Sequence, residues 1–241
     1  DNVYAYSAPY SNVIYVRGTY AADLKKAIGV SMPDPAFELA FRLQDTLTRL
    51  GITITQHANT IRRLAADGST INLDSQVIIA KHQSPALAEV VREFNQKSIN
   101  LYGESLIKTL ALKQGKTATT SEGLQVVKNV WTTKLGIDAN ALKMQDGSGL
   151  SPATRVTTLS MAKILASARK ESWFDTFYKS IPLNNDMVMK SGYIGGAIAY
   201  VGYQTTSAGI PFAFAFIVNN YNDGTAATRQ KMFSVLDILK N

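Results

Sequence analysis

The side chains best suited to chemistry in this sequence are Lys190-Ser191-Gly192, which directly follow the apolar run Met187-Val188-Met189. Two more strand-like runs follow, at residues 197–203 and 212–218. The pattern predicts a strand edge from which a cation and a hydroxyl project toward an anion. The glycine would let a substrate backbone come close, because it has no Cβ. Such a tripeptide also arises by chance, so its meaning depends on a second polar motif upstream.

Ser98 and Asn100 form that second motif. They lie in the polar stretch 95–100, between two segments with helical periodicity. One interpretation places both side chains in a cleft, where a hydroxyl and an amide face a peptide. The other makes one of them the N-cap of the following helix, where it accepts hydrogen bonds from free backbone N–H groups. The spacing leaves both interpretations open.

The composition is that of a globular protein. Of the 241 residues, 46% are hydrophobic and 18% are charged, which suits one large domain or one domain with an appendage. No apolar run reaches the roughly 18 residues of a transmembrane helix. The first residues show no basic-then-apolar leader, so we expect any signal peptide to be absent or already removed. The lack of cysteine excludes disulfides and is compatible with an oxidising compartment such as the periplasm.

The net charge of +7 is scattered along the chain. Nucleic-acid sites favour a basic stripe interleaved with aromatic residues. This sequence has no such stripe, so we expect no nucleic-acid partner. An acidic polymer is compatible with the charge. His57 and His82 lie in polar turns away from serines and carboxylate clusters, which disfavours a Ser-His-Asp triad. No His/Asp/Glu set has metal-ligand spacing. We expect neither a metal nor another cofactor.

Residues 1–80 mix strands with one helix. Alternating tyrosines predict strands within 1–20, and short apolar runs predict strands at 52–55 and 77–80. Asp34-Pro35 predicts a helix start, with the aspartate as N-cap and Gly51 at the end. We place a domain boundary between residues 80 and 81.

Residues 81–241 are expected to form the second domain. Apolar residues at helical spacing predict a helix capped at Ser84, one after residue 100, one ending at Gly136, one around 159–168 and a C-terminal one over about 226–239. We expect an α/β fold. Its C-terminal strands form an antiparallel sheet, with the C-terminal helix on one face and the helices of residues 84–180 on the other.

Three motifs in order carry a resemblance. Ser98-x-Asn100, then Asp146-Gly147-Ser148-Gly149-Leu150-Ser151, then Lys190-Ser191-Gly192 resemble those of the D-alanyl-D-alanine carboxypeptidase/endopeptidase family, the low-molecular-mass class C penicillin-binding proteins. The likeness runs from about residue 30 to the C-terminus. Ser191 replaces the threonine of a Lys-Thr-Gly motif and keeps the hydroxyl. Gly103 replaces a commoner alanine, and we expect little effect from that change.

The resemblance implies a penicillin-binding, serine β-lactamase-like transpeptidase fold in a periplasmic or other extracytoplasmic protein. Such a protein cleaves peptidoglycan stem peptides through an acyl-enzyme and is acylated by β-lactam antibiotics. In this reading Lys190 supplies a positive charge, Ser98 relays a proton to the departing amine and Asn100 holds the peptide amide. Substrate binding falls to Ser191, Gly192 and Tyr193, with the Tyr193 N–H as oxyanion donor.

The family's nucleophile motif, a Ser-x-x-Lys, should precede Ser98, and nothing before Ser98 fits. Three Ser-x-x-Lys matches lie after Ser98, in segments whose helical periodicity explains them as surface or core positions: Ser105/Lys108, Ser160/Lys163 and Ser167/Lys170. We therefore expect the nucleophile on an upstream segment. We also expect residues 1–80 to be the remnant of an accessory domain inserted between the first two motifs.

Two functions stay open at this point. One is a serine peptidase acting on peptidoglycan, and the other is a cell-wall-binding or scaffold protein that keeps the fold without a nucleophile. A serine β-lactamase is disfavoured, because no water-activating carboxylate motif is visible. Stem-peptide preference, exo- or endo-cleavage and oligomeric state are left open by the sequence.

Overall fold

The computed structural model describes residues 2–70, 72, 77–78 and 80–240. The chain divides into two compact units, Asp1–Lys81 and His82–Asn241, one residue after the boundary drawn from the sequence. The origin of the first unit as part of an inserted domain stays a prediction. Across the described residues, none of the helices is both long enough and apolar enough to span a membrane.

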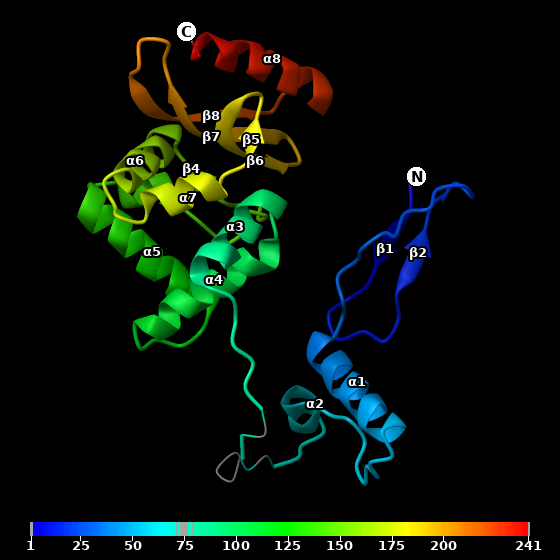
Figure 1. Cartoon of the computed structure of the whole chain (residues 1–241). Coiled ribbons are helices and arrows are strands. Elements are labelled where there is room, and N and C mark those ends of the chain that lie inside the picture. Colours follow the sequence, from blue (N-terminus) through cyan, green and yellow to red (C-terminus); the bar gives the residue numbers. More distant parts are fainter. Residues whose placement is uncertain (1, 71, 73–76, 79, 241) are drawn as a thin grey trace. The chain divides into compact units, whose positions relative to one another are not determined.

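A four-stranded antiparallel sheet lies at the centre of the second unit (Figure 1). Its strands lie side by side in the order β5 (Leu183–Asn184), β6 (Met187–Ile194), β7 (Ala197–Thr205) and β8 (Pro211–Asn219). β5 and β6 are joined through Asn185 and Asp186, both with positive φ, as in a type I′ hairpin. β6 pairs with β7 along its whole length, with Lys190 opposite Val201.

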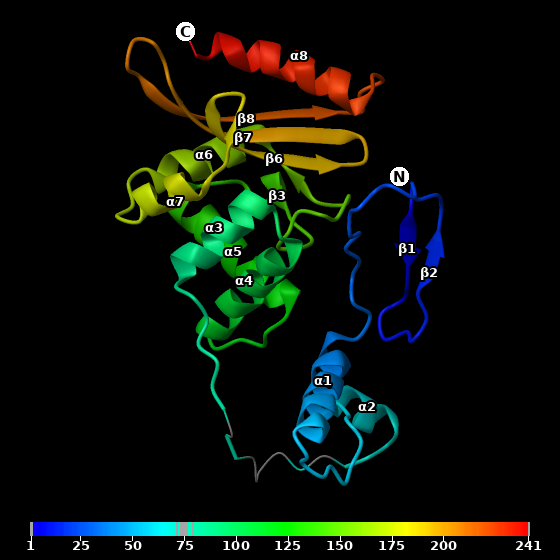
Figure 2. The same cartoon turned by 45° about the vertical axis from the view of Figure 1, so that its right-hand side comes forward.

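Helix α8 (Thr225–Ile238) covers one face of this sheet, and α6 (Thr158–Ala168) packs on the other (Figures 1 and 2). The core between the sheet and α8 contains Met187, Met189, Ile198, Tyr200, Phe214, Met232 and Leu236. Since strand side chains alternate between faces, the burial of Met187 and Met189 against α8 directs Lys190 to the helical side. The antiparallel sheet between the C-terminal helix and the other helices is confirmed.

Three further helices and a short one complete the helical side. They are α3 (Leu87–Lys97), α4 (Asn100–Lys113), α5 (Thr120–Leu135) and α7 (Phe174–Ser180). α4 packs along α5, and α3 packs along α7. α5 ends at Gly136 in the left-handed conformation, as predicted. The expected Ser84 cap is wrong, because α3 begins after Ala86 and has no side-chain cap.

The connection from α5 to α6 holds the glycine-rich turn. It begins with a 3₁₀ turn at Ala139–Ala141. A two-stranded ribbon of β3 (Leu142–Lys143) and β4 (Arg155–Val156) follows, and residues 146–152 lie between its strands.

The first unit contains a short hairpin and two helices. β1 (Tyr4–Tyr6) pairs antiparallel with β2 (Tyr15–Arg17), and α1 (Pro35–Arg49) and α2 (Ile61–Ala66) follow. Asp34 caps α1 by accepting from the Phe37 N–H at 3.1 Å, as predicted.

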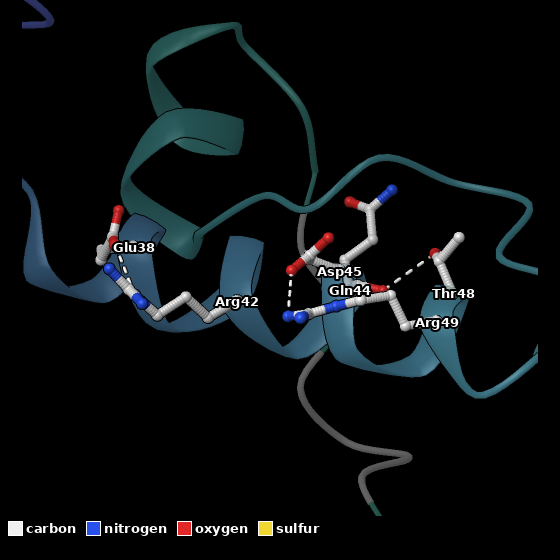
Figure 3. A network of polar contacts seen from close by, with 6 residues as sticks. All are labelled: Glu38, Arg42, Gln44, Asp45, Thr48 and Arg49. Carbon is white, nitrogen blue, oxygen red and sulfur yellow. Dashed lines mark hydrogen bonds and ion pairs between the residues drawn. The ribbon is translucent and has the colours of Figure 1, made fainter.

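Polar contacts one turn apart run along α1 (Figure 3). Arg42 pairs with Glu38 at 2.5 Å and Arg49 pairs with Asp45, while the Thr48 hydroxyl donates to the Gln44 carbonyl oxygen at 2.9 Å. None of the α1 side chains is buried. The helix is therefore held by its cap, its own surface pairs and contacts from residues 58–63. Arg62 pairs with the cap residue Asp34 at 2.7 Å, and the Arg63 guanidinium lies over the Phe37 ring at 4.1 Å.

Several predictions from short segments are wrong. Residues 52–55 form no strand, and neither do Val77, Ile78 and Ala80; Ile79 lies outside the described residues. Two short helices were missed. α2 is capped by Thr60, and α7 begins beside the aromatic pair Trp173–Phe177. Apolar runs of three or four residues do not specify a strand by themselves, because a strand needs a hydrogen-bonding partner.

We predict that Leu236→Ala weakens the second unit by about 2–5 kcal/mol, because it empties a packed site between α8 and the sheet. Leu236 is 1% exposed, whereas the preceding Val235 is 51% exposed. Val235→Ala is therefore the matched control, with an expected change within about 0.5 kcal/mol. Urea unfolding followed by near-ultraviolet circular dichroism measures both. Equal losses in the two variants would contradict this packing.

Candidate active site

The structure brings Lys190 and Ser98 into direct contact, although 92 positions separate them. The Lys190 ammonium donates to the Ser98 hydroxyl oxygen at 3.0 Å and to the Ser191 carbonyl oxygen at 2.9 Å. The lysine comes from the middle of β6, and the serine comes from the junction of α3 and α4. A cation and a hydroxyl from two distant motifs thus share one place in the fold.

The α3–α4 junction places Ser98 outside both helices. Ser98 ends α3 in the left-handed conformation, with φ 55° and ψ 47°, and Ile99 is the N-cap of α4, which has no side-chain cap. The helix-cap interpretation of Ser98 and Asn100 is therefore wrong. Asn100 is the first residue of α4, and its side chain is exposed.

Burial sets the electrostatics of Lys190. Partial removal from water disfavours the charged form, so the pKa of the ammonium falls below the usual 10.5. Within the described residues, no carboxylate forms an ion pair with Lys190. The site holds a partly desolvated cation whose partners are a hydroxyl and a carbonyl oxygen.

The outer edge of β6 is open beside Lys190. β5 pairs only with Met187 and Val188, and the Met189 N–H donates toward that same side, to the Pro182 carbonyl oxygen. Backbone groups alternate in direction along a strand, so those of Ser191 and Tyr193 face the unpaired edge. An extended peptide could add to β6 at this edge.

The motif Lys190-Ser191-Gly192-Tyr193 divides between the two faces of the sheet. Lys190 and Gly192 lie on the helical face, whereas Ser191 and Tyr193 lie on the α8 face, two and four residues after the buried Met189. The Arg229 guanidinium of α8 lies over the Tyr193 ring at 5.9 Å. The side chains of Lys190 and Ser191 thus lie on opposite faces of the sheet. They can contact the same ligand only if that ligand passes around the open edge of β6.

Glu104 and the glycine-rich turn form a contact that sequence reasoning missed. The Glu104 carboxylate accepts from the N–H groups of Gly147 and Ser148, both at 3.0 Å, and from the Ser148 hydroxyl at 2.9 Å. Glu104 stands four residues after Asn100 and thus on the same face of α4. This spacing of four residues was the signal in the sequence that could have placed Glu104 beside Asn100. The contact holds the turn against the helix that begins at Asn100.

The expectation that Gly103 matters little is wrong. A Cβ at Gly103 would lie 2.6 Å from the Gly147 carbonyl oxygen, and a Cβ at Gly147 would lie 2.4 Å from the Gly103 carbonyl oxygen. Two backbones meet here with no room for a side chain. An alanine at position 103 would push the turn away from α4.

The remaining candidates for chemistry lie elsewhere. The three Ser-x-x-Lys serines sit in α4 and α6, where the Ser105 and Ser167 hydroxyls donate to helix carbonyl oxygens and Ser160 contacts the cap residue Thr157. His57 and His82 are exposed and lie outside helices and strands. In the part of the chain that the structure describes, no group of three His, Asp or Glu residues could hold a metal ion.

We predict that Lys190 titrates below 10.5, since its surroundings disfavour the charge. Carbon-detected NMR of labelled lysines measures the midpoint, and Lys190→Arg identifies the resonance by its disappearance. The folded state releases this proton before the unfolded chain does, so the contribution of Lys190 to stability rises as the pH rises from the folded pKa to 10.5. A midpoint at or above 10.5 would refute the burial of this ammonium.

We predict that Glu104→Ala lowers stability by about 1–3 kcal/mol, because two part-buried N–H groups lose their acceptor. Glu104→Gln keeps one carbonyl oxygen and should lose less. Hydrogen exchange at Gly147 and Ser148 should speed up in both variants. Glu122→Ala is the control, since Glu122 pairs with Lys116 at the surface and should cost at most about 1 kcal/mol. Unchanged exchange at the two amides would contradict the contact.

Two curated proteins are similar to this chain in sequence. The chain is 26% identical over 201 residues to a D-alanyl-D-alanine carboxypeptidase of Actinomadura sp. (strain R39), a match that covers 83% of this chain and 36% of the relative. It is 25% identical over 183 residues to the carboxypeptidase DacB of Haemophilus influenzae, covering 68% of this chain and 38% of the relative. The chain thus spans less than two fifths of the length of either curated relative.

The solved structure of penicillin-binding protein 4 from H. influenzae in complex with a β-lactam superposes with a TM-score of 0.77 at 20% identity, over 100% of this chain and 59% of that one. A second structure of the same protein gives 0.69 at 22% identity, over 83% and 48%. These likenesses confirm the α/β penicillin-binding fold. The model of the D-Ala-D-Ala carboxypeptidase 3 (S13) family matches residues 7–240, and the chain belongs to that family.

Proposed function

We propose that the full-length protein containing this chain is an extracytoplasmic, serine-type D-Ala-D-Ala carboxypeptidase or endopeptidase that acts on peptidoglycan stem peptides. The observation that carries the proposal is the 3.0 Å contact between the Lys190 ammonium and the Ser98 hydroxyl oxygen, which joins two motifs in a chain of the S13 family. The nucleophilic serine and its own lysine would come from a segment upstream of residue 1.

Acylation would proceed at the junction of β6 and α4. The upstream serine attacks the peptide carbonyl carbon, its proton passes to a base, and an ester forms while the amide C–N bond breaks. Ser98 lies where it can pass a proton to the departing amine, because the Lys190 ammonium holds its oxygen. Water then hydrolyses the ester and restores the serine. Lys190 keeps the local potential positive, which lowers the pKa of a neighbouring lysine base.

Substrate positioning would use the open edge of β6. An extended stem peptide can pair with the outward backbone groups of Ser191 and Tyr193, with Gly192 leaving room for its backbone. The Tyr193 N–H would donate to the oxyanion; losing one such donor costs on the order of 100- to 1000-fold in rate. Asn100 can hold the peptide amide through both halves of its own amide.

We predict that the full-length product forms a covalent adduct with fluorescent penicillin, on a serine upstream of this chain. Lys190→Ala and Ser98→Ala should slow adduct formation by about 100-fold or more, because both handle the transferred proton and its charge. Ser105→Ala is the matched control and should react at the wild-type rate, since its hydroxyl bonds its own helix. Peptide mass mapping identifies the acylated residue.

Other outcomes point to other functions. No adduct from folded full-length protein would favour the cell-wall-binding or scaffold protein without a nucleophile. An adduct on Ser105, Ser160 or Ser167 would overturn the assignment of the nucleophile to an upstream segment. Rapid turnover of nitrocefin would favour a β-lactamase.

A further inference from the structure

The segment 180–184 leads from the end of α7 into β5 and contacts both elements that carry the candidate site. α7 packs along α3, which ends at Ser98, and β5 pairs with β6, which carries Lys190 (Figure 1). Ser180, the first residue of this segment, is 2% exposed, and Ile181 after it is also buried. We call residues 180–184 the strap. Its two ends are held by separate sets of hydrogen bonds.

Two neighbouring side chains of α3 hold the first residue of the strap. The Asn95 amide donates to the Ser180 hydroxyl oxygen at 2.7 Å, and the Gln96 amide donates to the Ser180 carbonyl oxygen at 2.9 Å. The Ser180 hydroxyl in turn donates to the Phe177 carbonyl oxygen at 2.6 Å. Both oxygens of this buried serine therefore accept from α3, and loss of the donors would leave them unsatisfied at a cost.

The other end of the strap holds the residue that precedes Lys190. The Met189 N–H donates to the Pro182 carbonyl oxygen at 3.0 Å, and the Asn184 amide donates to the Met189 carbonyl oxygen at 2.8 Å. Both backbone polar groups of Met189 are thus bonded to the strap. The Met189 side chain is buried in the core against α8. The strap therefore meets β6 at a point that the core already holds.

These contacts form a closed cycle that includes the candidate site. One half runs from Ser98 back along α3 to Gln96 and into the strap. The other half runs from the strap to Met189 and on to Lys190, whose ammonium returns to the Ser98 hydroxyl at 3.0 Å. A lysine side chain is flexible, so its contact with Ser98 depends on the distance between the two backbones. The strap spans that distance.

We propose that the strap sets the spacing between Lys190 and Ser98, and that Asn95 and Gln96 are positioning residues for acyl transfer. The inference rests on the proposed function for the reaction itself. Both side chains act through Ser180 on the places of α3 and β6. A misplacement of about 1 Å can cost on the order of 100-fold in rate even when its cause lies away from the chemistry. The strap would therefore govern the rate of acylation rather than the initial binding of the ligand.

The test separates acylation from binding in the full-length product. Stopped-flow measurements with fluorescent penicillin give the constant for initial binding and the rate constant for acylation. The double variant Asn95→Ala/Gln96→Met removes both donors without a change in charge. It should lower the acylation rate constant about tenfold or more and leave the initial binding constant unchanged.

A second measurement on the same protein reports the place of Lys190 directly. A displaced ammonium is more hydrated, so the double variant should titrate with a pKa closer to 10.5 than the wild type does. NMR of labelled lysines measures this midpoint. If the double variant does not fold, Asn95→Ala and Gln96→Met are measured singly. Each of them keeps one donor and should show a smaller part of both effects.

Tyr203→Phe is the matched control. The Tyr203 hydroxyl donates to the Leu165 carbonyl oxygen of α6 at 2.7 Å, so this variant also removes a hydrogen bond between two elements at a buried site and leaves the strap intact. Thermal unfolding should show a loss of stability in both proteins. The acylation rate constant and the Lys190 midpoint should keep their wild-type values in Tyr203→Phe.

An unchanged acylation rate constant or an unchanged Lys190 midpoint in the folded double variant overturns the proposal, and so does an equal slowing in Tyr203→Phe. A wild-type protein that forms no adduct would lose the enzymatic assignment, and the Lys190 midpoint alone would then test the strap. A wild-type protein that forms the adduct, with a double variant that forms it equally fast, would keep the enzyme and lose the role of the strap.

Discussion

The hydrogen bond between the Lys190 ammonium and the Ser98 hydroxyl is the contact on which the rest of the site depends. It can form only because the core fixes which way β6 faces. Met187 and Met189 are buried against α8, so the alternation of the strand turns Lys190 to the helical side. A slip of one residue would carry the lysine to the opposite face. The hydrophobic core thus sets the position of the site's central cation.

The same alternation distributes polar groups over both sides of one strand edge. The lysine faces the α3–α4 junction, while Ser191 and Tyr193 face α8 and its Arg229. The strand edge itself lies between these faces, and within the described residues no strand pairs with it beyond Val188. The Met189 backbone is still bonded there, to the Pro182 carbonyl oxygen and the Asn184 side chain. A ligand that pairs with the backbone of β6 would therefore have a cation on either side of it. A ligand that entered from one face alone would meet only half of these groups.

Long periodic segments of the sequence predicted the sheet, the C-terminal helix and the side of the sheet that each would occupy. The order of the motifs likewise predicted that Ser98 and Lys190 would converge. The sequence could not reveal the meeting of Gly103 with Gly147, because it depends on how closely two distant backbones approach. The strand predicted from the short apolar run 52–55 was wrong for a related reason. Whether such a run forms a strand depends on a hydrogen-bonding partner that lies elsewhere in the chain.

The charges around the open edge of β6 bear on the kind of ligand that this edge suits. The partial burial of Lys190 costs solvation without the return of an ion pair, and Arg229 is likewise without a carboxylate partner in the described part of the chain. A partly buried cation without a counter-ion favours a negative group beside it. A bound anion would offset the cost of desolvating Lys190. An extended peptide that ends in a carboxylate would supply this anion and would also pair with the free backbone groups of β6. A neutral peptide could only pair with the backbone groups.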